Sequence, residues 1–246
     1  MKSIKACAVF GAMAIMAALS AAPVVAGPVS GQGTWETTLQ ARDLNGDSVT
    51  DAFYDTVLNI TWLRDANVNG RMNWNDAVAW ANGLTLGGYS DWRLPTMVDT
   101  GAPGCDAGYD CFYNVQTKTG STVYSEMAHL WYVTLGNLAY CPPGDLASNC
   151  GPQAGWGLTN TGDFQNMLGA ETDVYWSGLA YAPDSTEAWY FRTYNGLQDS
   201  IGKRFTLYAM AVHPGDVATQ VPEPESLALV LGGLMAAWVV RRRRPR

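Results

Sequence analysis

Apolar residues recur at helical spacing in two segments of the chain. In residues 74–82 they occupy positions i, i+3, i+4 and i+7, which places them on one face of a helix. Asn73 can cap the start of this helix and Gly83 can end it. The second segment runs from Ser125, a candidate cap, to Gly136. The apolar faces that we expect to pack on a core consist of Trp74, Ala77, Val78 and Ala81 in the first helix and Met127, Leu130, Trp131 and Leu135 in the second.

Five further segments have the β-branched and aromatic composition of strands. They are residues 34–41, 52–63, 174–181, 187–196 and 203–212. The first two flank a stretch rich in turn residues and predict a hairpin, and the last three are joined by turn residues. Two helices followed by a late antiparallel set of strands predict an α+β domain.

The N-terminus has the pattern of a secretory signal peptide. Lys2 and Lys5 precede an apolar run over residues 6–19, and small residues follow up to Ala26. This pattern predicts cleavage after Ala26, so residues 1–26 are excluded from the fold. A membrane anchor is the alternative, but the run is shorter than the roughly 20 apolar residues that a spanning helix needs.

A second apolar run covers residues 226–240, near the C-terminus. As a helix it would span about 22 Å at 1.5 Å per residue, against roughly 30 Å of hydrocarbon. Four consecutive arginines at 241–244 would hold that end in the cytoplasm. Pro222 and Pro224 cannot continue the helix backwards, so the residues before it are expected to be extended and accessible. We therefore predict a short transmembrane helix over 226–240 with an exposed motif on one side and a basic stop on the other.

This tail resembles the PEP-CTERM signal of Gram-negative bacteria that make exopolysaccharide. The residues that carry the resemblance are Pro222, Glu223 and Pro224, followed by the apolar run and by Arg241, Arg242, Arg243 and Arg244. The resemblance implies that a membrane exosortase recognises the motif and removes the helix. The protein would then leave through the Sec machinery, be held transiently in the inner membrane, and reach the cell surface or extracellular matrix. An ordinary single-pass anchor is the alternative.

Four cysteines remain once Cys7 has left with the signal peptide; they are Cys105, Cys111, Cys141 and Cys150. An even number of cysteines in an exported chain indicates disulfides, and three pairings are possible. The economical pairing joins the two close neighbours at each site, 105 with 111 and 141 with 150. Zinc is the alternative, but the C-x5-C and C-x8-C spacings differ from the C-x2-C of structural zinc sites.

The segment between the two signals, residues 27–220, has a length that suits one domain, two small ones being the alternative. It carries eight Lys and Arg against twenty Asp and Glu, a net charge of −12. Such a charge disfavours binding to nucleic acid, which needs clustered basic residues. A polyanion would have to rely on a local patch, for which Lys203, Arg204 and Arg192 are the candidates. The segment also holds nine tryptophans, most of which we expect in the core.

One acidic turn has the spacing of a calcium loop. Its candidate ligands, at positions one, three, five and nine of an EF-type loop, are Asp43, Asn45, Asp47 and Asp51. Ser48 stands where that loop needs glycine, and Tyr54 stands where it needs a bidentate acid. Because Asn-Gly-Asp is also ordinary turn chemistry, a solvated turn is the favoured interpretation. Calcium is the one cofactor that remains a candidate.

The sequence holds two histidines, His129 and His213, and neither lies near a Cys or Ser motif. We expect His129 to point away from the apolar face of its helix, as a surface or hydrogen-bonded residue. The sequence shows no motif for a nucleophile paired with a base, for a metal triad or for a phosphate loop. We therefore predict a binding or structural protein, and not an enzyme.

Several segments together resemble the Lcl C-terminal domain family of bacterial surface proteins. The resemblance covers about residues 51–216 and rests on Trp62–Thr96, with "NWNDAVAWANGL" and "GGYSDWRLPT", and on Tyr175–Val212. It implies a C-type-lectin-like fold and a role in adhesion or glycan binding. His213 stands where the family usually closes with an arginine-bearing strand, and the cysteine-containing segment is longer than the family minimum, so no ligand-binding residue is carried over. The alternatives are a structural matrix component or, third, a lectin-fold enzyme.

Overall fold

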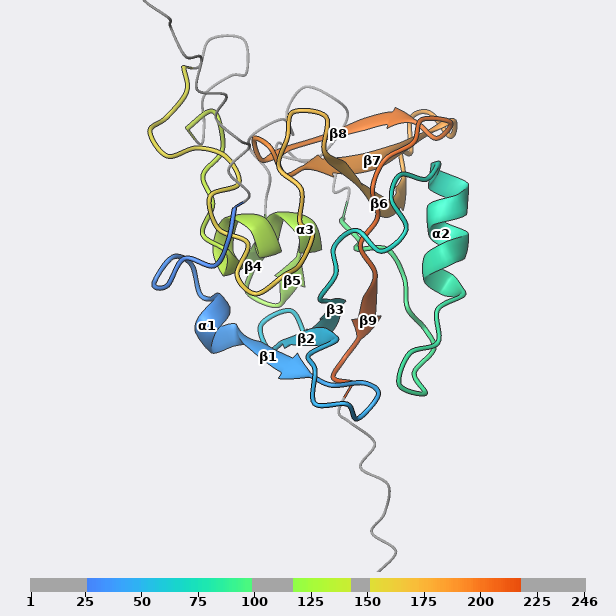
Figure 1. The fold of residues 1–246 in the computed structure, drawn as a ribbon. Coiled ribbons are helices and arrows are strands. Elements are labelled where there is room, and N and C mark those ends of the chain that lie inside the picture. The colour runs from blue at the N-terminus through green and yellow to red at the C-terminus, as the bar shows by residue number, and fades with distance from the viewer. Residues whose placement is uncertain (1–25, 99–116, 143–150, 218–246) are drawn as a thin grey trace, which may run out of the picture.

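The structure, a computed structural model, describes residues 26–98, 117–142 and 151–217. Over these residues the fold is mixed α+β and mostly β, with antiparallel sheets and short helices (Figure 1). A three-stranded sheet and a four-stranded sheet lie at opposite ends of the molecule. Helix α2 lies to one side of the region between them, and α3 and the turn that continues it lie between them on the other.

The four-stranded sheet has the order β1-β2-β3-β9 and is antiparallel throughout. Its strands are β1 Leu39–Arg42, β2 Ala52–Asp55, β3 Ile60–Leu63 and β9 Val212–Pro214. The predicted hairpin is present as β1 and β2. The pairing of Trp62 with Val212 joins the beginning of the domain to its end.

The first two predicted strands differ from the observed ones in two ways. Residues 35–38 form a short helix, α1 Trp35–Thr38, because the carbonyl of Thr34 accepts hydrogen bonds from the amides of Thr37 and Thr38. Residues 52–63 form two strands, because the Asp55 carboxylate accepts from the amides of Val57 and Leu58 and turns the chain. These side-chain and local hydrogen bonds compete with a continuous strand.

The three-stranded sheet has the order β6-β7-β8. Strand β6 Val174–Ala180 confirms the prediction for its segment, and β7 Glu187–Arg192 confirms the first six residues of the strand predicted over 187–196, whose last four residues form a turn. Strand β8 Leu197–Gly202 was not predicted, because its centre is polar; Gln198 is nevertheless buried and accepts a hydrogen bond from Ser125. A small hairpin, β4 Lys118–Thr119 and β5 Thr122–Val123, completes the described strands.

The predicted strand over 203–212 is wrong for most of its length. Residues 207–214 form an extended seam that bonds in turn to several parts of the domain. Leu207 exchanges two backbone hydrogen bonds with Met72, Tyr208 bonds to β6, and Val212 exchanges two with Arg93. Since its partners change every few residues, only the end of the seam, β9, belongs to a regular sheet.

Helix α2, Trp74–Asn82, confirms the first predicted helix. The Asn73 side chain accepts from the amide of Asp76 at 3.0 Å, and Gly83 is the C-cap. Ala77 and Ala81 are fully buried. Local signals, a cap and a small-residue face, are therefore enough to specify this element.

The second predicted helix is shorter and changes type. Ser125 caps α3, Glu126–Ala128, as expected, and the chain continues as a π-helix, η1 His129–Thr134. The amide of Leu135 donates to the carbonyl of Leu130, five residues back, at 2.8 Å. Every residue from Ser125 to Trp131 is buried, and the element becomes exposed only near its end, at Val133.

The core consists of two main clusters of buried residues. The first contains Trp62, Trp131 and Phe191 and lies among the four-stranded sheet, η1 and one face of the three-stranded sheet. The second contains Ala77, Ala81 and Trp176 and packs α2 on the opposite face of that sheet. Five of the nine tryptophans are at most 1% exposed, which confirms that most of them belong to the core.

The expectation for His129 is wrong. The ring is 4% exposed, and neither of its nitrogens has a hydrogen-bond partner among the described residues. Helical periodicity placed it on an outer face, but η1 lies between two sheets and is covered on both sides. Desolvation, with a smaller contribution from Lys118, lowers the pKa of His129 to about 4.

Candidate functional site

The predicted sorting and anchoring residues lie outside the described residues. They are Pro222, Glu223, Pro224, the span 226–240 and Arg241 to Arg244; most of the predicted signal peptide, residues 1–25, lies outside as well. In the part of the chain that the structure does describe, no helix has the length and apolar character to cross a membrane.

Of the four predicted disulfide cysteines, only Cys141 is among the described residues. Its side chain is fully buried and takes part in a disulfide. Cys105, Cys111 and Cys150 lie outside the described ranges. The pairing of 105 with 111 and of 141 with 150 therefore stays a prediction.

The acidic turn over residues 43–51 directs its side-chain oxygens at its own backbone. The Asp43 carboxylate accepts from the amides of Gly46 at 2.6 Å and Ser48 at 2.8 Å, and Asp51 accepts from Leu44 at 2.8 Å. Desolvation alone would raise the pKa of Asp43, but the backbone donors hold that pKa below its usual range.

The other two candidate calcium ligands behave in the same way. Asn45 accepts from the amide of Asp47 at 2.9 Å, and Asp47 accepts from the amide of Val49 at 2.8 Å. No group of three or more His, Cys, Asp or Glu placed to hold a metal occurs within residues 26–98, 117–142 and 151–217. This turn chemistry needs no cation; the solvated turn stays the prediction, and calcium binding by the loop stays its untested alternative.

A surface hollow of about 490 Å³ lies where β7 begins and β8 ends. Its lining residues are Thr186, Glu187, Ser200, Ile201, Gly202, Arg204 and Phe205. Phe205 is 44% exposed, which makes it the one aromatic among the exposed large hydrophobic side chains of the described residues. The Arg204 guanidinium lies 5.2 Å from the centre of its ring. The hollow therefore combines an accessible aromatic ring with a cation.

Polar groups on the neighbouring strands complete the lining of the hollow. Ser200 on β8 and Glu187 on β7 are diagonal neighbours, and the Ser200 hydroxyl donates to the Glu187 carboxylate at 2.7 Å. The amide of Phe205 donates to the carbonyl of Gly202, which turns the chain at the end of β8 and presents the ring beside these groups. Hydroxyl, carboxylate and guanidinium groups thus surround one aromatic ring.

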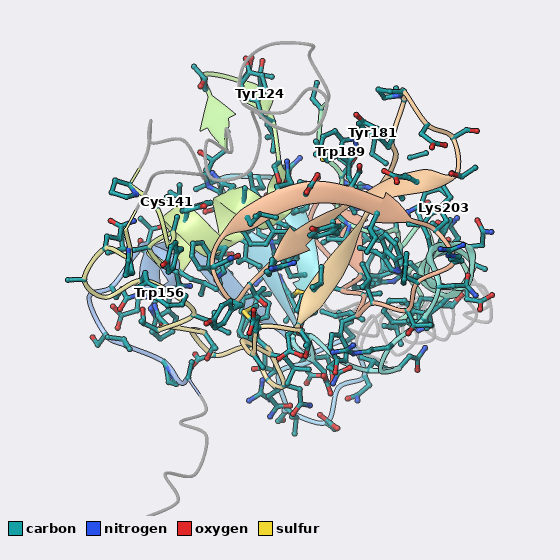
Figure 2. The ribbon with its side chains drawn as sticks, turned by 90° about the horizontal axis from the view of Figure 1, so that it is seen from above. Tyr124, Cys141, Trp156, Tyr181, Trp189 and Lys203 are labelled. Carbon is teal, nitrogen blue, oxygen red and sulfur yellow. The ribbon has the colours of Figure 1, made fainter. Side chains whose placement is uncertain are left out.

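The rim of the hollow is held in place by the first residue of α2. Lys203 lies over the Trp74 ring, with its ammonium 4.3 Å from the ring centre, and donates to the carbonyl of Ser185 at 2.8 Å. The Trp74 indole donates to the carbonyl of Ser177 at 2.9 Å. Figure 2 shows Lys203 at one end of the three-stranded sheet. Two elements therefore fix this rim, and the hollow does not depend on a single loop.

The expected basic patch of Lys203, Arg204 and Arg192 does not form. Gly202 pairs with Glu187 at the start of β7, whereas Arg192 is at the other end of that strand and pairs with Leu197. Five residues of extended strand separate the two ends by about 16 Å. Among the described residues, the basic groups beside the hollow are therefore Lys203 and Arg204.

A second group of aromatic rings lies near Cys141, on the other side of the molecule from Lys203 (Figure 2). The Trp156 ring contacts Tyr140 at 4.9 Å and Tyr194 at 5.1 Å between centres, both edge to face. All three residues are half-buried. Because these rings already pack against one another, they are a weaker candidate for stacking on a ligand.

Sequence reasoning missed the hollow because it assigned residues 203–212 to a strand. The sequence signal that could have found it is the dipeptide of two basic residues followed by Phe205, directly after a glycine. What the sequence alone could not provide is the approach of Trp74, which is more than a hundred residues away in the chain.

The remaining histidine also lies away from this hollow. His213 is on β9, and its ring packs edge to face on Trp92 and Tyr89, with 5.5 Å between centres in both cases. It is therefore part of the packing between β9 and the segment after α2.

Comparison with known proteins identifies the class through the tail alone. The family model of the PEP-CTERM protein-sorting motif matches residues 220–244. The motif marks an exported protein that is sorted at the membrane to the cell surface, with an exosortase as its processing partner. No curated protein and no solved structure matches the chain. The resemblance to the Lcl C-terminal domain family receives no support from these comparisons.

Proposed function

We propose that this protein is a non-catalytic glycan-binding or adhesive module of the cell surface or extracellular matrix, and that the hollow at Phe205 is its binding site. The observation that carries the proposal is the exposed ring of Phe205 beside hydroxyl, carboxylate and guanidinium groups. Sugar rings present apolar faces and a fringe of hydroxyls, so such a surface suits them. The tail supports the location, because it directs the chain to the cell exterior.

The sugar is expected to be neutral or weakly charged. Residues 27–220 carry a net charge of −12, which repels polyanions. Lys203 and Arg204 are the nearby cations, and each already lies over an aromatic ring. Binding by stacking releases few counterions and therefore depends little on salt.

The experiment uses the mature exported protein and compares a neutral polysaccharide with a sulfated one. Phe205→Ala should weaken binding to the neutral polymer about three- to tenfold, the usual range for one aromatic contact. Val29→Ala, which truncates another exposed apolar side chain, should leave it unchanged. The affinity should change little between about 50 and 300 mM salt, over which the screening length falls by more than half.

Two results would overturn this proposal. Tight, salt-sensitive binding to the sulfated polymer alone would mean that charge and not stacking drives recognition. The absence of binding to any polysaccharide would favour a structural matrix component without a specific ligand, which is the second candidate.

The remaining parts of the proposal rest on the sequence. The proposal includes a C-type-lectin-like domain, export through the Sec machinery and a transient inner-membrane anchor over 226–240. It assigns no role to nucleic acid. What supports a non-catalytic role is the lack of a nucleophile-and-base motif in the sequence. A lectin-fold enzyme is the third candidate, and calcium bound at Asp43 is the one cofactor that it could share with the binding role.

A further inference from the structure

A separate cavity of about 250 Å³ lies between the acidic turn and the segment that follows α2. Most of its wall is apolar and is formed by Leu44, Leu63, Val68, Leu84 and Leu86. The polar part of the lining consists of Asn45 and two carboxylates, Asp51 and Asp65. No residue of this cavity lines the hollow at Phe205, so the two sites are independent.

The walls of the cavity are fixed by close packing. Gly87 has a left-handed φ of +59°, and a side chain there would approach the carbonyl oxygen of Leu44 to 2.6 Å. Leu86 and Tyr89 exchange two backbone hydrogen bonds, of 3.0 and 2.9 Å. The segment after α2 therefore rests directly on the acidic turn, and the space between them is part of the fold.

The cavity also leaves an apolar side chain in water. Val68 is 49% exposed although it belongs to the wall, whereas Leu63 on the same wall is 6% exposed. A bound apolar group would cover the valine and gain the free energy of removing this surface from water. The cavity thus favours a ligand with an apolar body.

The two carboxylates determine the charge of that ligand. Asp51 accepts from the amide of Leu44, and Asp65 accepts from the amide of Asn67 and the side-chain amide of Asn166. All of these donors are neutral, and none of the ion pairs in the part of the chain that the structure describes involves either carboxylate.

The nearest arginine in sequence forms no ion pair with them. Arg64 donates to the backbone carbonyls of Thr50 and Asp163. Asp43 and Asp47, on the turn beside the cavity, add further negative charge. The electrostatic complement of the site is therefore a cation.

We propose that this cavity binds a small organic cation, an amine or guanidine carried on an apolar body. Its volume corresponds to about eight water molecules at roughly 30 Å³ each, which limits the ligand to about ten non-hydrogen atoms. A neutral apolar ligand would remove water from two carboxylates without replacing its hydrogen bonds, and an anion would be repelled. A metal ion alone would leave the apolar wall uncovered.

The test measures binding of three probes of similar shape to the full mature protein by ligand-observed NMR. Benzylamine, which is cationic at neutral pH, should bind with a dissociation constant on the order of 1 mM, as expected for so few atoms. Benzyl alcohol and benzoate should bind at least about tenfold more weakly, because they lack the charge that the carboxylates attract.

Two variants locate the binding. Val68→Trp fills the cavity from its exposed edge, where a larger side chain does not disturb the core, and should abolish the benzylamine signal. Asp65→Asn should weaken binding about tenfold, whereas Glu171→Gln, which removes a charge from an exposed position elsewhere, should not change it. Circular dichroism of each variant verifies that it is folded.

Several outcomes overturn the proposal. They are equal binding of the three probes, preference for benzoate, benzylamine binding that survives Val68→Trp, and calcium binding at the turn without any binding of benzylamine. Because Phe205→Ala leaves this cavity intact, failure of the glycan proposal does not affect the result.

Discussion

The buried ring of His129 makes the stability of the domain sensitive to mild acid. The pKa of this group is near 6.5 in an unfolded chain and about 4 in the fold, because desolvation disfavours the charged ring. The unfolded chain therefore binds the proton first as the pH falls. Stability from this residue is complete above pH 6.5 and is lost progressively between about pH 6.5 and 4.

The magnitude follows from the same two values. At pH 5 nearly all unfolded chains carry the proton on His129, but only about a tenth of folded chains do. This difference lowers the free energy of unfolding by about 2 kcal/mol relative to neutral pH. Allowing for solvent screening reduces the expected loss in unfolding free energy between pH 8 and pH 5 to about 1–2 kcal/mol. Urea unfolding at pH 8, 6.5 and 5 measures it.

Substitution separates this residue from the carboxylates of Asp55 and Asp199, whose pKa is raised by burial. His129→Leu removes the ionisable group from an apolar site and should flatten the dependence between pH 8 and 5. His213→Gln keeps His129 and should retain the dependence of the wild type. If His129→Leu and the wild type lose the same stability, the buried ring is not the cause and the reasoning fails.

Four further predictions concern other parts of the chain. Arg93→Ala should cost about 3 kcal/mol of unfolding free energy, because it leaves the buried carboxylate of Glu126 without its cation and with the amide of Thr96 as its remaining donor. Arg93→Ala/Glu126→Gln should recover part of this cost; denaturant titration that finds no cost would contradict the prediction. Non-reducing peptide mapping should link Cys105 to Cys111 and Cys141 to Cys150, and other pairs would refute the local pairing. The melting temperature should be the same with added calcium as with a chelator, because the oxygens of the acidic turn already accept hydrogen bonds from its own amides. A higher melting temperature with calcium would contradict this prediction. The intact mass of the mature protein should correspond to cleavage near Val221, and a dominant species that retains Arg241 to Arg244 would exclude exosortase processing.

Local signals were sufficient for some elements and insufficient for others. Helix α2 was predictable because its cap, its apolar face and its stop lie within eleven residues of one another. The π-helical turn was not, since the burial of His129 depends on two sheets that the helical spacing does not reveal. Strand β8 was missed because its buried glutamine is satisfied by Ser125, 73 residues away in sequence.

Local sequence signals were likewise sufficient for one candidate site and insufficient for the others. The sorting motif is linear and could be recognised from residues 220–244 directly, as the comparison confirms. The hollow at Phe205 depends on a chain reversal after β8 and on Trp74, and the cavity at Asp65 depends on contact between two distant turns. Consecutive residues specify neither site completely; for the hollow they give only the basic pair before Phe205, and for the cavity they give no pattern.

The seam over residues 207–214 determines how the domain would resist a pulling force. It begins two residues after Phe205 and ends just before the tail, so tension between a ligand in the hollow and a membrane holding the tail would run along this segment. Backbone hydrogen bonds tie the segment to Met72, β6, Arg93 and β3 along its length. The load would be shared among these ladders, while the acidic turn stays outside the path of the force.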